Sequence, residues 1–404
     1  MQGKIVCELI PTPDNKRNSE GAFINLKDGS ILYAYTRYHK GSHDHDPADV
    51  YGIISKDDGE TWGEPFLIIT AASVGAHNLM SISLMRMNNG DLGLIYLRKD
   101  NVQTTDGSIY LTGPNSQGNI TQEAYAAITC APWIIRSADE GKTWSEPLKC
   151  ITTPGYYVLC NDRMIRLDSG RWLMPISHIG FTKEDTISFY ASDDDGYTWK
   201  ALVEDIPLPL NLWHSYGSFN ASAMEPGVVQ LKDGTIWCFI RTRMSVQYEM
   251  FSHDNGETWT TPNPSRFTSA NSPMSARKLS DNKIFVIWNP IPRFLDREYK
   301  GQYVKWKWSR TPYACALLSE TGGKFLMAED FETDRDRGFC YGAVHETPAG
   351  DILLGYCAGN EEEDGDWLNR VRITKMYKSD IMARVEEIRS GNFKIPEEDL
   401  SKHN

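Results

Sequence analysis

Polar side chains recur at the ends of a series of expected β-hairpins, where together they could bind an anionic ligand and transfer protons. Glu225 and Arg241 lie at equal distances from the turn Lys232–Gly234, so antiparallel pairing brings a carboxylate next to a guanidinium. Other hairpins carry polar residues at comparable positions, namely Glu20, Arg37, Arg98, Arg163, His178, Asn289 and Tyr341. Such a ring of polar strand ends is unusual for a purely structural surface and indicates a functional site.

Each of these residues also has a purely structural interpretation. Glu225 and Arg241 can form a cross-strand ion pair and nothing more. Tyr341 can be a packed aromatic residue. Arg163 and His178 can contact a ligand or hydrogen-bond each other. The residues alone leave these alternatives open.

The hairpins that must position these side chains are themselves a repeat. Each consists of an apolar run, a polar turn with Gly or Asn and a second apolar run, which is the pattern of a β-hairpin. The copies occupy residues 23–33, 84–94, 164–174, 228–238, 277–287 and 344–354. Because the two ends of a hairpin lie side by side, each copy delivers both of its ends to one mouth of the fold.

A second repeat, Ser-x-Asp-x-Gly-x-Thr-Trp, occurs at residues 55–62, 137–144, 192–199 and 252–259. Ser and Asp side chains can bond nearby backbone N–H groups, Gly permits a positive φ, and Trp can pack beneath the loop. The octad is therefore predicted to be a structural turn. A metal site built from its aspartates is disfavoured, because each copy contains only one fixed carboxylate.

Pairing each hairpin with the octad that follows gives one four-stranded sheet per unit. Six such sheets arranged radially predict an all-β fold, a six-bladed β-propeller. Repeats across most of the chain favour a single domain, residues 1–404. The fifth octad is eroded at residues 319–325, and the strand at residues 4–10 is expected to supply the outer strand of the last blade and close the ring.

Two segments fall outside the repeats. Residues 101–127 are polar and rich in Gly, Thr, Gln and Asn, which predicts a loop insertion in the second blade. Residues 379–389 have a helical period, with Ser379 or Asp380 available as the N-cap. The C-terminal region of about residues 379–404 is thus expected to be a short helix followed by a charged tail.

Composition and charge exclude several classes of protein. The formal net charge of −12, with no basic stripe, argues against a general nucleic-acid-binding protein. No apolar run approaches the roughly 18 residues of a membrane span, so no membrane insertion is expected. The N-terminus lacks the apolar core of a signal peptide. We therefore expect a cytoplasmic protein, or a secreted or periplasmic one if a leader has been removed.

The sequence predicts neither a metal nor a cofactor. The eight cysteines are scattered, several of them within apolar runs, and are expected to be small core residues. No Cys/His cluster suggests zinc. The alternating His and Asp residues at 43–46 could suggest a metal site, but an exposed loop of this kind is more often simply solvated.

The octad resembles the Asp-box of sialidases (neuraminidases) and related BNR-repeat β-propellers, and the resemblance covers nearly the whole chain. In that family a Tyr activated by a Glu attacks the anomeric carbon, an Asp is the acid/base, and three arginines hold the substrate carboxylate. Residues 225–241 resemble the stretch that carries the Glu and the second arginine. The resemblance implies that Tyr341 is the nucleophile and Glu225 its base. It also implies that Arg241 and Arg310 hold a carboxylate.

Two positions of the family pattern are less well defined here. The acid/base is expected in the loop after the first hairpin, which offers Asp44 and Asp46, with Asp44 slightly favoured. The first arginine of the family falls near Ser19 and Glu20, and Arg17 lies just upstream. Either a small insertion lets Arg17 serve, or Glu20 has replaced a clamp arginine. A carboxylate there would repel a sialic acid and suit a neutral or differently substituted sugar.

The expected function is that of a glycoside hydrolase resembling exo-α-sialidases, which removes terminal sialic acid or a related acidic sugar from a glycan with retention of configuration. Two alternatives stay open. A related propeller could act on a different sugar, such as a uronic acid, by hydrolysis or elimination. Alternatively, the propeller could bind carbohydrate without turnover.

Overall fold

The computed structural model describes residues 2–100, 129–179, 185–209, 222–291, 298–299, 302–303 and 310–391, and confirms the all-β class. Three short helical elements lie wholly within these residues. They are the 3-10 helix η1 (Ala72–Val74), α2 (Glu361–Asp364) and α3 (Lys378–Arg389).

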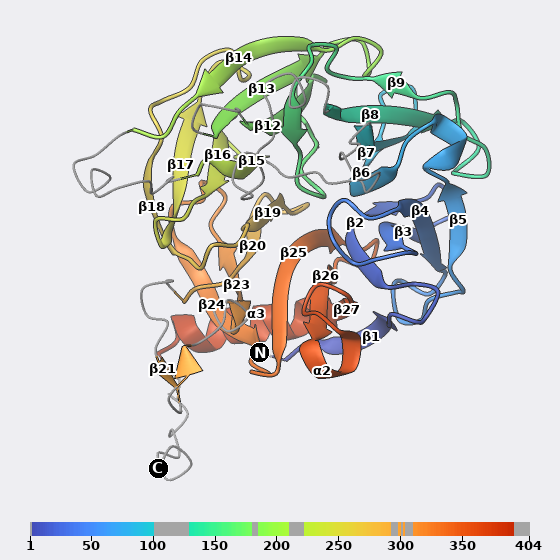
Figure 1. Cartoon of the computed structure of the whole chain (residues 1–404). Helices are drawn as coiled ribbons and strands as arrows, with labels where there is room; N and C mark the ends of the chain where they lie inside the picture. Colours follow the sequence, from blue (N-terminus) through green and yellow to red (C-terminus); the bar gives the residue numbers. More distant parts are fainter. Residues whose placement is uncertain are drawn as a thin grey trace.

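The strands form one larger sheet and three separate antiparallel sheets of four strands each. These sheets lie around a common centre (Figure 1). The first contains, in spatial order, β1 (Lys4–Leu9), β27 (Val371–Met376), β26 (Ile352–Asn360) and β25 (Arg337–Glu346). The second contains β15 (Met224–Gln230), β16 (Ile236–Arg241), β17 (Val246–Ser252) and β18 (Asn263–Thr268). The third contains β19 (Ser275–Lys278), β20 (Ile284–Trp288), β23 (Tyr313–Leu318) and β24 (Phe325–Glu332). A small ribbon pairs β21 (Glu298–Tyr299) with β22 (Gln302–Tyr303).

The larger, 13-stranded sheet consists of three antiparallel groups joined by single parallel pairs, Ala48 with Asn78 and Cys130 with Tyr156. The first group is β2 (Arg17–Asn25), β3 (Ile31–Tyr38), β4 (Ala48–Ser55) and β5 (Phe66–Ile69). The next is β6 (Asn78–Arg86), β7 (Leu92–Asp100), β8 (Thr129–Ser137) and β9 (Leu148–Lys149). The last is β10 (Tyr156–Val158), β11 (Ile165–Arg166), β12 (Trp172–Ile179), β13 (Thr186–Ser192) and β14 (Lys200–Ile206).

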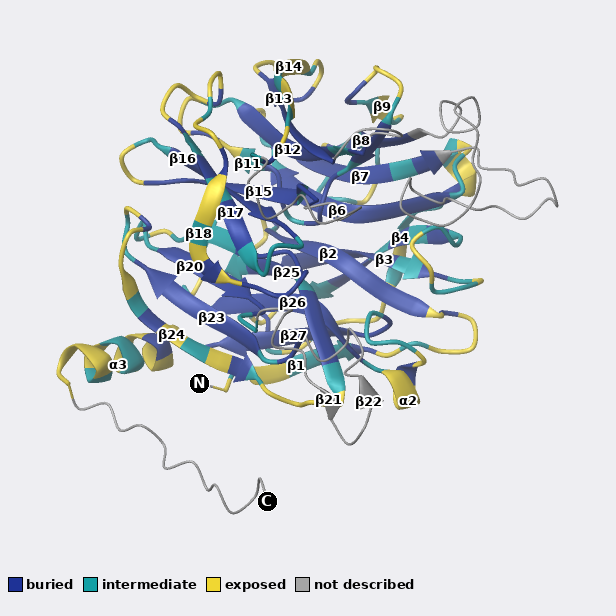
Figure 2. Ribbon diagram, turned by 60° about the vertical axis from the view of Figure 1, so that its left-hand side comes forward, coloured by how far each residue is buried: buried dark blue, intermediate teal, exposed yellow. Residues whose placement is uncertain are grey.

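The six predicted hairpins are confirmed as antiparallel pairs, β2–β3, β6–β7, β11–β12, β15–β16, β19–β20 and β25–β26. Neighbouring sheets pack face to face through apolar side chains. One cluster, for example, joins Phe239 of β16 to Val286 of β20. Figure 2 shows that these inner strands are buried, whereas exposed residues gather on turn tips, on β18 and on α3.

The octads form turns held by one set of hydrogen bonds, as predicted. In the first octad, the Ser55 hydroxyl donates to Asp57 (2.8 Å) and accepts from the Gly59 N–H (2.9 Å). The N–H and hydroxyl of Thr61 both donate to the Asp57 carboxylate. The tryptophan of each octad packs, partly buried, against an apolar cluster. The same bonds recur in the other three copies, so the structural role of the octad is confirmed.

The chain termini meet in one sheet. Strand β1 pairs antiparallel with β27, with Leu9 opposite Val371, which confirms that the N-terminal strand is the outer strand of the last sheet. Helix α3 is also confirmed, but its N-cap is Tyr377, whose own side chain makes no capping hydrogen bond, so the expected cap at Ser379 or Asp380 is wrong. The reason is that the Asp351 carboxylate accepts from the backbone N–H of Lys378 (2.9 Å), at the first residue of the helix.

Other sequence-based expectations meet the structure only partly. The predicted insertion at residues 101–127 and the charged tail lie outside the described residues. Within the described ranges, no group of three or more His, Cys, Asp or Glu is placed to hold a metal ion. None of the helices in those ranges has both the length and the apolar character needed to cross a bilayer.

The pairing of β1 with β27 yields a stability prediction. Leu9 is 9% exposed and packs in a cluster with Tyr33 and Ile373, whereas Ile5 on the same strand is 50% exposed. We expect Leu9→Ala to lower the free energy of unfolding by about 2–3 kcal/mol. Ile5→Ala should cost less than about 1 kcal/mol. Urea midpoints of the two variants test this, and equal effects would contradict the docking of β1.

Candidate active site

The site is built on a repeated irregularity of the inner strands. Strands β2, β6, β15 and β25 each contain a bulge, and in each bulge one non-glycine residue has a positive φ. These residues are Glu20 (50°), Ser81 (58°), Glu225 (46°) and Tyr341 (54°). Non-glycine residues are uncommon in this left-handed region and mark sites where the chain is forced to redirect a side chain. All four line one cavity of about 330 Å³.

The bulges shift the strand pairing away from the symmetric pairing about the turn that was expected for the hairpins. Arg241 pairs with Met224 rather than Glu225, because the extra residue lies between Met224 and Gly227. Arg37 likewise pairs with Asn18 rather than Glu20. The bulged side chain nevertheless reaches the same mouth, so the expected grouping of Glu225 with Arg241 is confirmed.

Tyr341, Glu225 and Arg241 form a compact triad. The Tyr341 hydroxyl donates to Glu225 Oε1 (3.2 Å), and Arg241 Nη1 donates to Glu225 Oε2 (2.6 Å). Arg241 Nη1 also reaches the Tyr341 oxygen at 3.4 Å. Burial and then the Glu225 charge raise the pKa of Tyr341, while Arg241 opposes that shift. The tyrosine is therefore neutral at rest, with a proton acceptor already in hydrogen-bond contact.

Arg310 lies beside this triad and is held by its surroundings. Its guanidinium lies 4.3 Å from the ring centre of Trp367 and 5.4 Å from that of Tyr341. Nη2 donates to the Asn271 carbonyl (3.3 Å), and the Asn271 side chain accepts from Arg241 Nε (2.9 Å), so one residue links the two arginines. The Nη1 atom of Arg310 has no hydrogen-bond partner among the described residues, although the residue is only 4% exposed.

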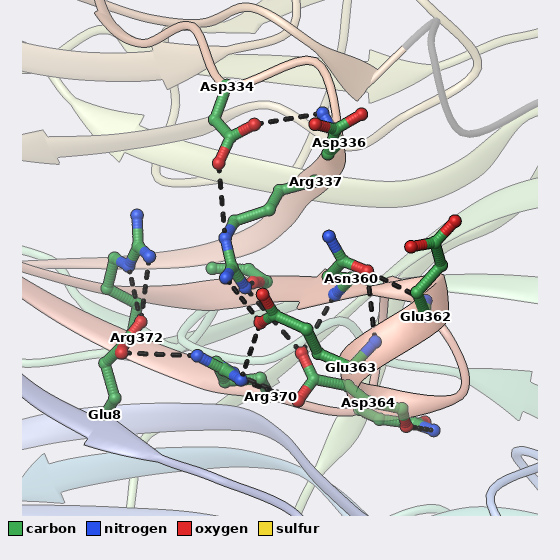
Figure 3. A network of polar contacts seen from close by, with 12 residues as sticks. Glu8, Asp334, Asp336, Arg337, Asn360, Glu362, Glu363, Asp364, Arg370 and Arg372 are labelled. Atoms are coloured by element: carbon green, nitrogen blue, oxygen red, sulfur yellow. Dashed lines mark hydrogen bonds and ion pairs between the residues drawn. The ribbon is translucent and has the colours of Figure 1, made fainter.

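The loop that carries Trp367 is fixed by a network of ion pairs (Figure 3). Arg370 donates to Asp364 (2.8 Å) and to Glu363 (3.2 Å), and Arg337 donates to Glu363 (2.7 Å). The Asn369 carbonyl of the same loop accepts from the backbone N–H of Asn18 on β2. The loop therefore connects Arg310 to the strand that carries Arg17 and Glu20.

Arg17 is buried, and both terminal nitrogens of its guanidinium are hydrogen-bonded to other residues. It is 1% exposed, and its guanidinium donates to Asp44 (2.6 Å), to the Ser42 carbonyl (3.1 Å), to Ser19 (3.0 Å) and to Glu20 (3.2 Å). It is not among the residues that line the cavity. The structure thus places Glu20, and not Arg17, on the wall of the site.

Glu20 is an unusual carboxyl group. It is 4% exposed, and its Oε2 accepts a 2.5 Å hydrogen bond from the Ser81 hydroxyl. Burial raises the pKa of Glu20 from 4.5 to about 7, against the opposing effect of Arg17. The group is therefore poised to change charge near neutral pH.

The structure separates the two candidate aspartates. Asp44 lines the cavity with its side chain half exposed, whereas Asp46 accepts from the backbone N–H of His43 (2.8 Å) and does not line it. Desolvation of the Asp44 carboxylate acts to raise its pKa. The positive charges of Arg17 and Lys99 outweigh that effect and lower the pKa. Asp44 is therefore ionised in the resting site.

Lys99 is a cavity residue that the sequence analysis missed. It is 3% exposed, and its ammonium donates to the Asp44 carbonyl (2.5 Å) and contacts His45 (3.2 Å). The residue expected at this position was its neighbour Arg98, whose guanidinium instead packs on the Trp133 ring. Side chains alternate along a strand, so a one-residue shift at the end of β7 would have identified Lys99.

Asp185 also lines the cavity without having been anticipated. Its carboxylate accepts from the Ser222 hydroxyl (2.6 Å). Asn271 and Trp367, which hold the two arginines, were likewise missed. They lie in loops that carry no repeat, and no sequence signal available from one chain marks them.

Several predicted site residues do not line the cavity. Arg37 packs on the ring of Tyr51 at 4.6 Å. Arg163 is buried and donates to Ser275 and to the Met274 carbonyl. His178 bonds Asp205 and stacks on a tyrosine ring, so neither expected role, ligand contact or a bond to Arg163, is supported. Asn289 supports the site indirectly, because its amide donates to the Arg310 carbonyl (2.9 Å).

The pKa of Glu20 predicts how stability depends on pH. Between pH 4.5 and about 7 the folded protein holds a proton that the unfolded chain has lost, so stability falls as pH rises through this window. Gln cannot ionise, and we expect Glu20→Gln to be more stable than the parent protein at pH 8, by up to about 3 kcal/mol, but not at pH 4.5.

Urea unfolding at pH 4.5 and pH 8 measures this difference. The exposed Glu362→Gln variant is the control and should follow the parent at both pH values. If the free energy of unfolding of Glu20→Gln and that of the parent change equally between pH 4.5 and pH 8, the pKa of Glu20 is not raised by folding.

Comparison of the sequence with family models identifies the family of this chain. The family model described as a BNR repeat-like domain matches residues 42–354. A Bacteroides fragilis protein named sialidase is 23% identical over 258 residues, which is 60% of this chain and 43% of that protein, so the match spans less than half of the relative.

Solved structures share the fold at low sequence identity. A Dyadobacter fermentans protein of unknown function superposes with a TM-score of 0.66 at 19% identity, covering 93% of this chain and 99% of that one. The intramolecular trans-sialidase of Ruminococcus gnavus superposes with a TM-score of 0.66 at 15% sequence identity, covering 93% of this chain and 97% of that one. The NanB sialidase of Streptococcus pneumoniae superposes with a TM-score of 0.65 at 15% sequence identity, covering 94% of this chain and 71% of that one. By its family match, this chain belongs to the BNR repeat-like domain family of the sialidase superfamily.

Proposed function

We propose that this protein is a glycoside hydrolase of the sialidase type that removes a terminal acidic sugar from a glycan with retention of configuration. The observation that carries the proposal is the hydrogen bond from the Tyr341 hydroxyl to the buried Glu225 carboxylate. Next to it, the guanidinium of Arg241 lines the same cavity and can donate hydrogen bonds to a substrate carboxylate.

The architecture that supports this proposal is a single six-bladed propeller. The three four-stranded sheets and the three groups of the larger sheet supply the blades. The bulges of β2, β6, β15 and β25 all face one cavity, as expected for blades that surround a common axis.

In the first step, the Tyr341 oxygen attacks the anomeric carbon and the bond to the leaving group breaks. Glu225 takes the phenolic proton as the new carbon–oxygen bond forms, which avoids a free phenolate in a buried site that raises the pKa of Tyr341. A neutral nucleophile also avoids repulsion from an anionic sugar. In the second step, water attacks the same carbon, and the departing Tyr341 oxygen recovers its proton from Glu225.

Asp44 supplies the remaining proton transfers in this scheme. Once protonated it donates to the leaving-group oxygen, and it then takes a proton from the attacking water. Arg17 and Lys99 lower its pKa, which suits the second role and limits the first to acidic pH. Hydrolysis of sugars with poor leaving groups is accordingly fastest below neutral pH.

The comparisons support the proposal in a restricted way. Similar proteins are named as sialidases and as an intramolecular trans-sialidase, at 15–23% identity. The substrate of this chain therefore has to be inferred from its own cavity.

Replacing the nucleophile tests the mechanism. We expect Tyr341→Phe to lower kcat on aryl glycosides of acidic sugars by at least about 1,000-fold, because the attacking oxygen is lost. Tyr51→Phe, which changes a tyrosine packed against Arg37 outside the cavity, is the matched control and should retain activity. Fluorophore release measures both variants. Full activity of Tyr341→Phe would exclude covalent catalysis by this residue.

Replacing Arg310, whose guanidinium packs on the ring of the nucleophile Tyr341, tests the acidic character of the substrate. Arg310→Gln should raise KM for an acidic aryl glycoside about 10- to 100-fold, since it removes a buried positive charge near the nucleophile. Arg37→Gln, outside the cavity, should leave KM unchanged. An equal response of acidic and neutral glycosides to Arg310→Gln would argue against a carboxylate at that position.

A further inference from the structure

Glu20 lies next to the nucleophile. Asn161 Nδ2 donates to the carbonyl of Gly21 (2.8 Å) and to the carbonyl of Tyr341 (3.0 Å), so a single amide ties the bulge of β2 to that of β25. Glu20 and Tyr341 are the positive-φ residues of these two bulges, and both line the same cavity. The Glu20 carboxyl group therefore forms part of the cavity wall beside Tyr341.

Arg17 cannot take over that wall by a change of rotamer alone. Moving its guanidinium into the cavity would break four hydrogen bonds, including those to Asp44 (2.6 Å) and Ser19 (3.0 Å). It would also leave Glu20 and Asp44 without their shared cation. Breaking a buried ion pair in this way costs several kcal/mol.

A carboxyl beside the attacked carbon distinguishes two classes of acidic sugar. In a sialic acid, the anomeric carbon itself carries the carboxylate, and the adjacent ring carbon carries no hydroxyl. In a hexuronic acid, the anomeric carbon carries hydrogen, the adjacent carbon carries the 2-hydroxyl, and the carboxylate lies on the other side of the ring oxygen. Glu20 offers no cation to pair with the first arrangement and repels it when ionised, whereas it can accept a hydrogen bond from the 2-hydroxyl of the second.

The carboxyl group has the capacity for that bond. Each carboxylate oxygen accepts two hydrogen bonds. One is occupied at Oε1, by Arg17, and one at Oε2, by Ser81. Hydrogen bonds to the 2-hydroxyl also strengthen in the transition state of glycoside hydrolysis, so a residue at this place contributes to rate as well as to selection.

We propose that the glycone is a hexuronic acid whose 2-hydroxyl donates to Glu20 while its carboxylate pairs with Arg241. This inference rests on the proposed function and specifies its substrate class. Glu20 is then the specificity-determining residue, because it stands where a third arginine would otherwise select a carboxylate on the anomeric carbon. The remaining cavity residues keep the roles described above.

The test compares aryl hexuronides of both anomeric configurations with an aryl α-sialoside and with the 2-deoxy counterpart of the hexuronide that is hydrolysed. We expect kcat/KM on one hexuronide to exceed that on the sialoside at least 10-fold and to depend on Tyr341. Glu20→Gln should lower the ratio of kcat/KM for the hexuronide to that for its 2-deoxy counterpart at least 10-fold. Glu249→Gln, which alters a carboxylate bonded to Trp237, should leave that ratio unchanged.

The outcomes separate this inference from the proposed function. Tyr341-dependent hydrolysis of the sialoside alone would support the hydrolase and overturn the hexuronic acid. An unchanged ratio in Glu20→Gln would also overturn the role of Glu20. If no glycoside is hydrolysed, the proposed function fails, and binding of methyl hexuronides measured by saturation-transfer NMR decides the inference. Binding that weakens in Glu20→Gln supports it, and no binding overturns it.

Discussion

The site depends on the left-handed residue at the bulge of four inner strands, β2, β6, β15 and β25. In a regular strand, side chains would alternate between the two faces of the sheet, and none would point along the strand into the mouth. The bulge redirects one side chain at a cost of roughly 1–3 kcal/mol per strained residue. Local hydrogen bonds offset that cost: the Glu225 N–H donates to Ser177 (2.7 Å), and Asn161 binds the Tyr341 carbonyl.

Most of the fold could be predicted from the sequence because its signals are local. A hairpin needs only a turn residue and flanking apolar runs, and the octad contains within eight residues every donor and acceptor that its turn uses. The N-cap of α3 could not be predicted, because the acceptor for Lys378 is Asp351, which lies on a different element. Tertiary contacts of this kind leave no trace in a local pattern.

The candidate site was predictable only where symmetry about a turn applied. Glu225, Arg241 and Tyr341 lie together as the hairpins required, although the bulge in β15 shifts the pairing by one residue. Lys99 was missed because the choice between neighbouring strand residues depends on which face is inside. Asn271 was missed because its role is to link two arginines that are distant in sequence.

The balance of charge in the cavity explains why the wall formed by Glu20 matters most for the choice of substrate. Arg241 is neutralised by Glu225, and Arg17 by Glu20 and Asp44. The ammonium of Lys99 is engaged by the Asp44 carbonyl and by His45. Arg243, which lines the cavity, and Arg310, which packs on the Tyr341 ring, add further positive charge. A ligand with a single carboxylate has to place it near the arginines and meet Glu20 with a hydroxyl group.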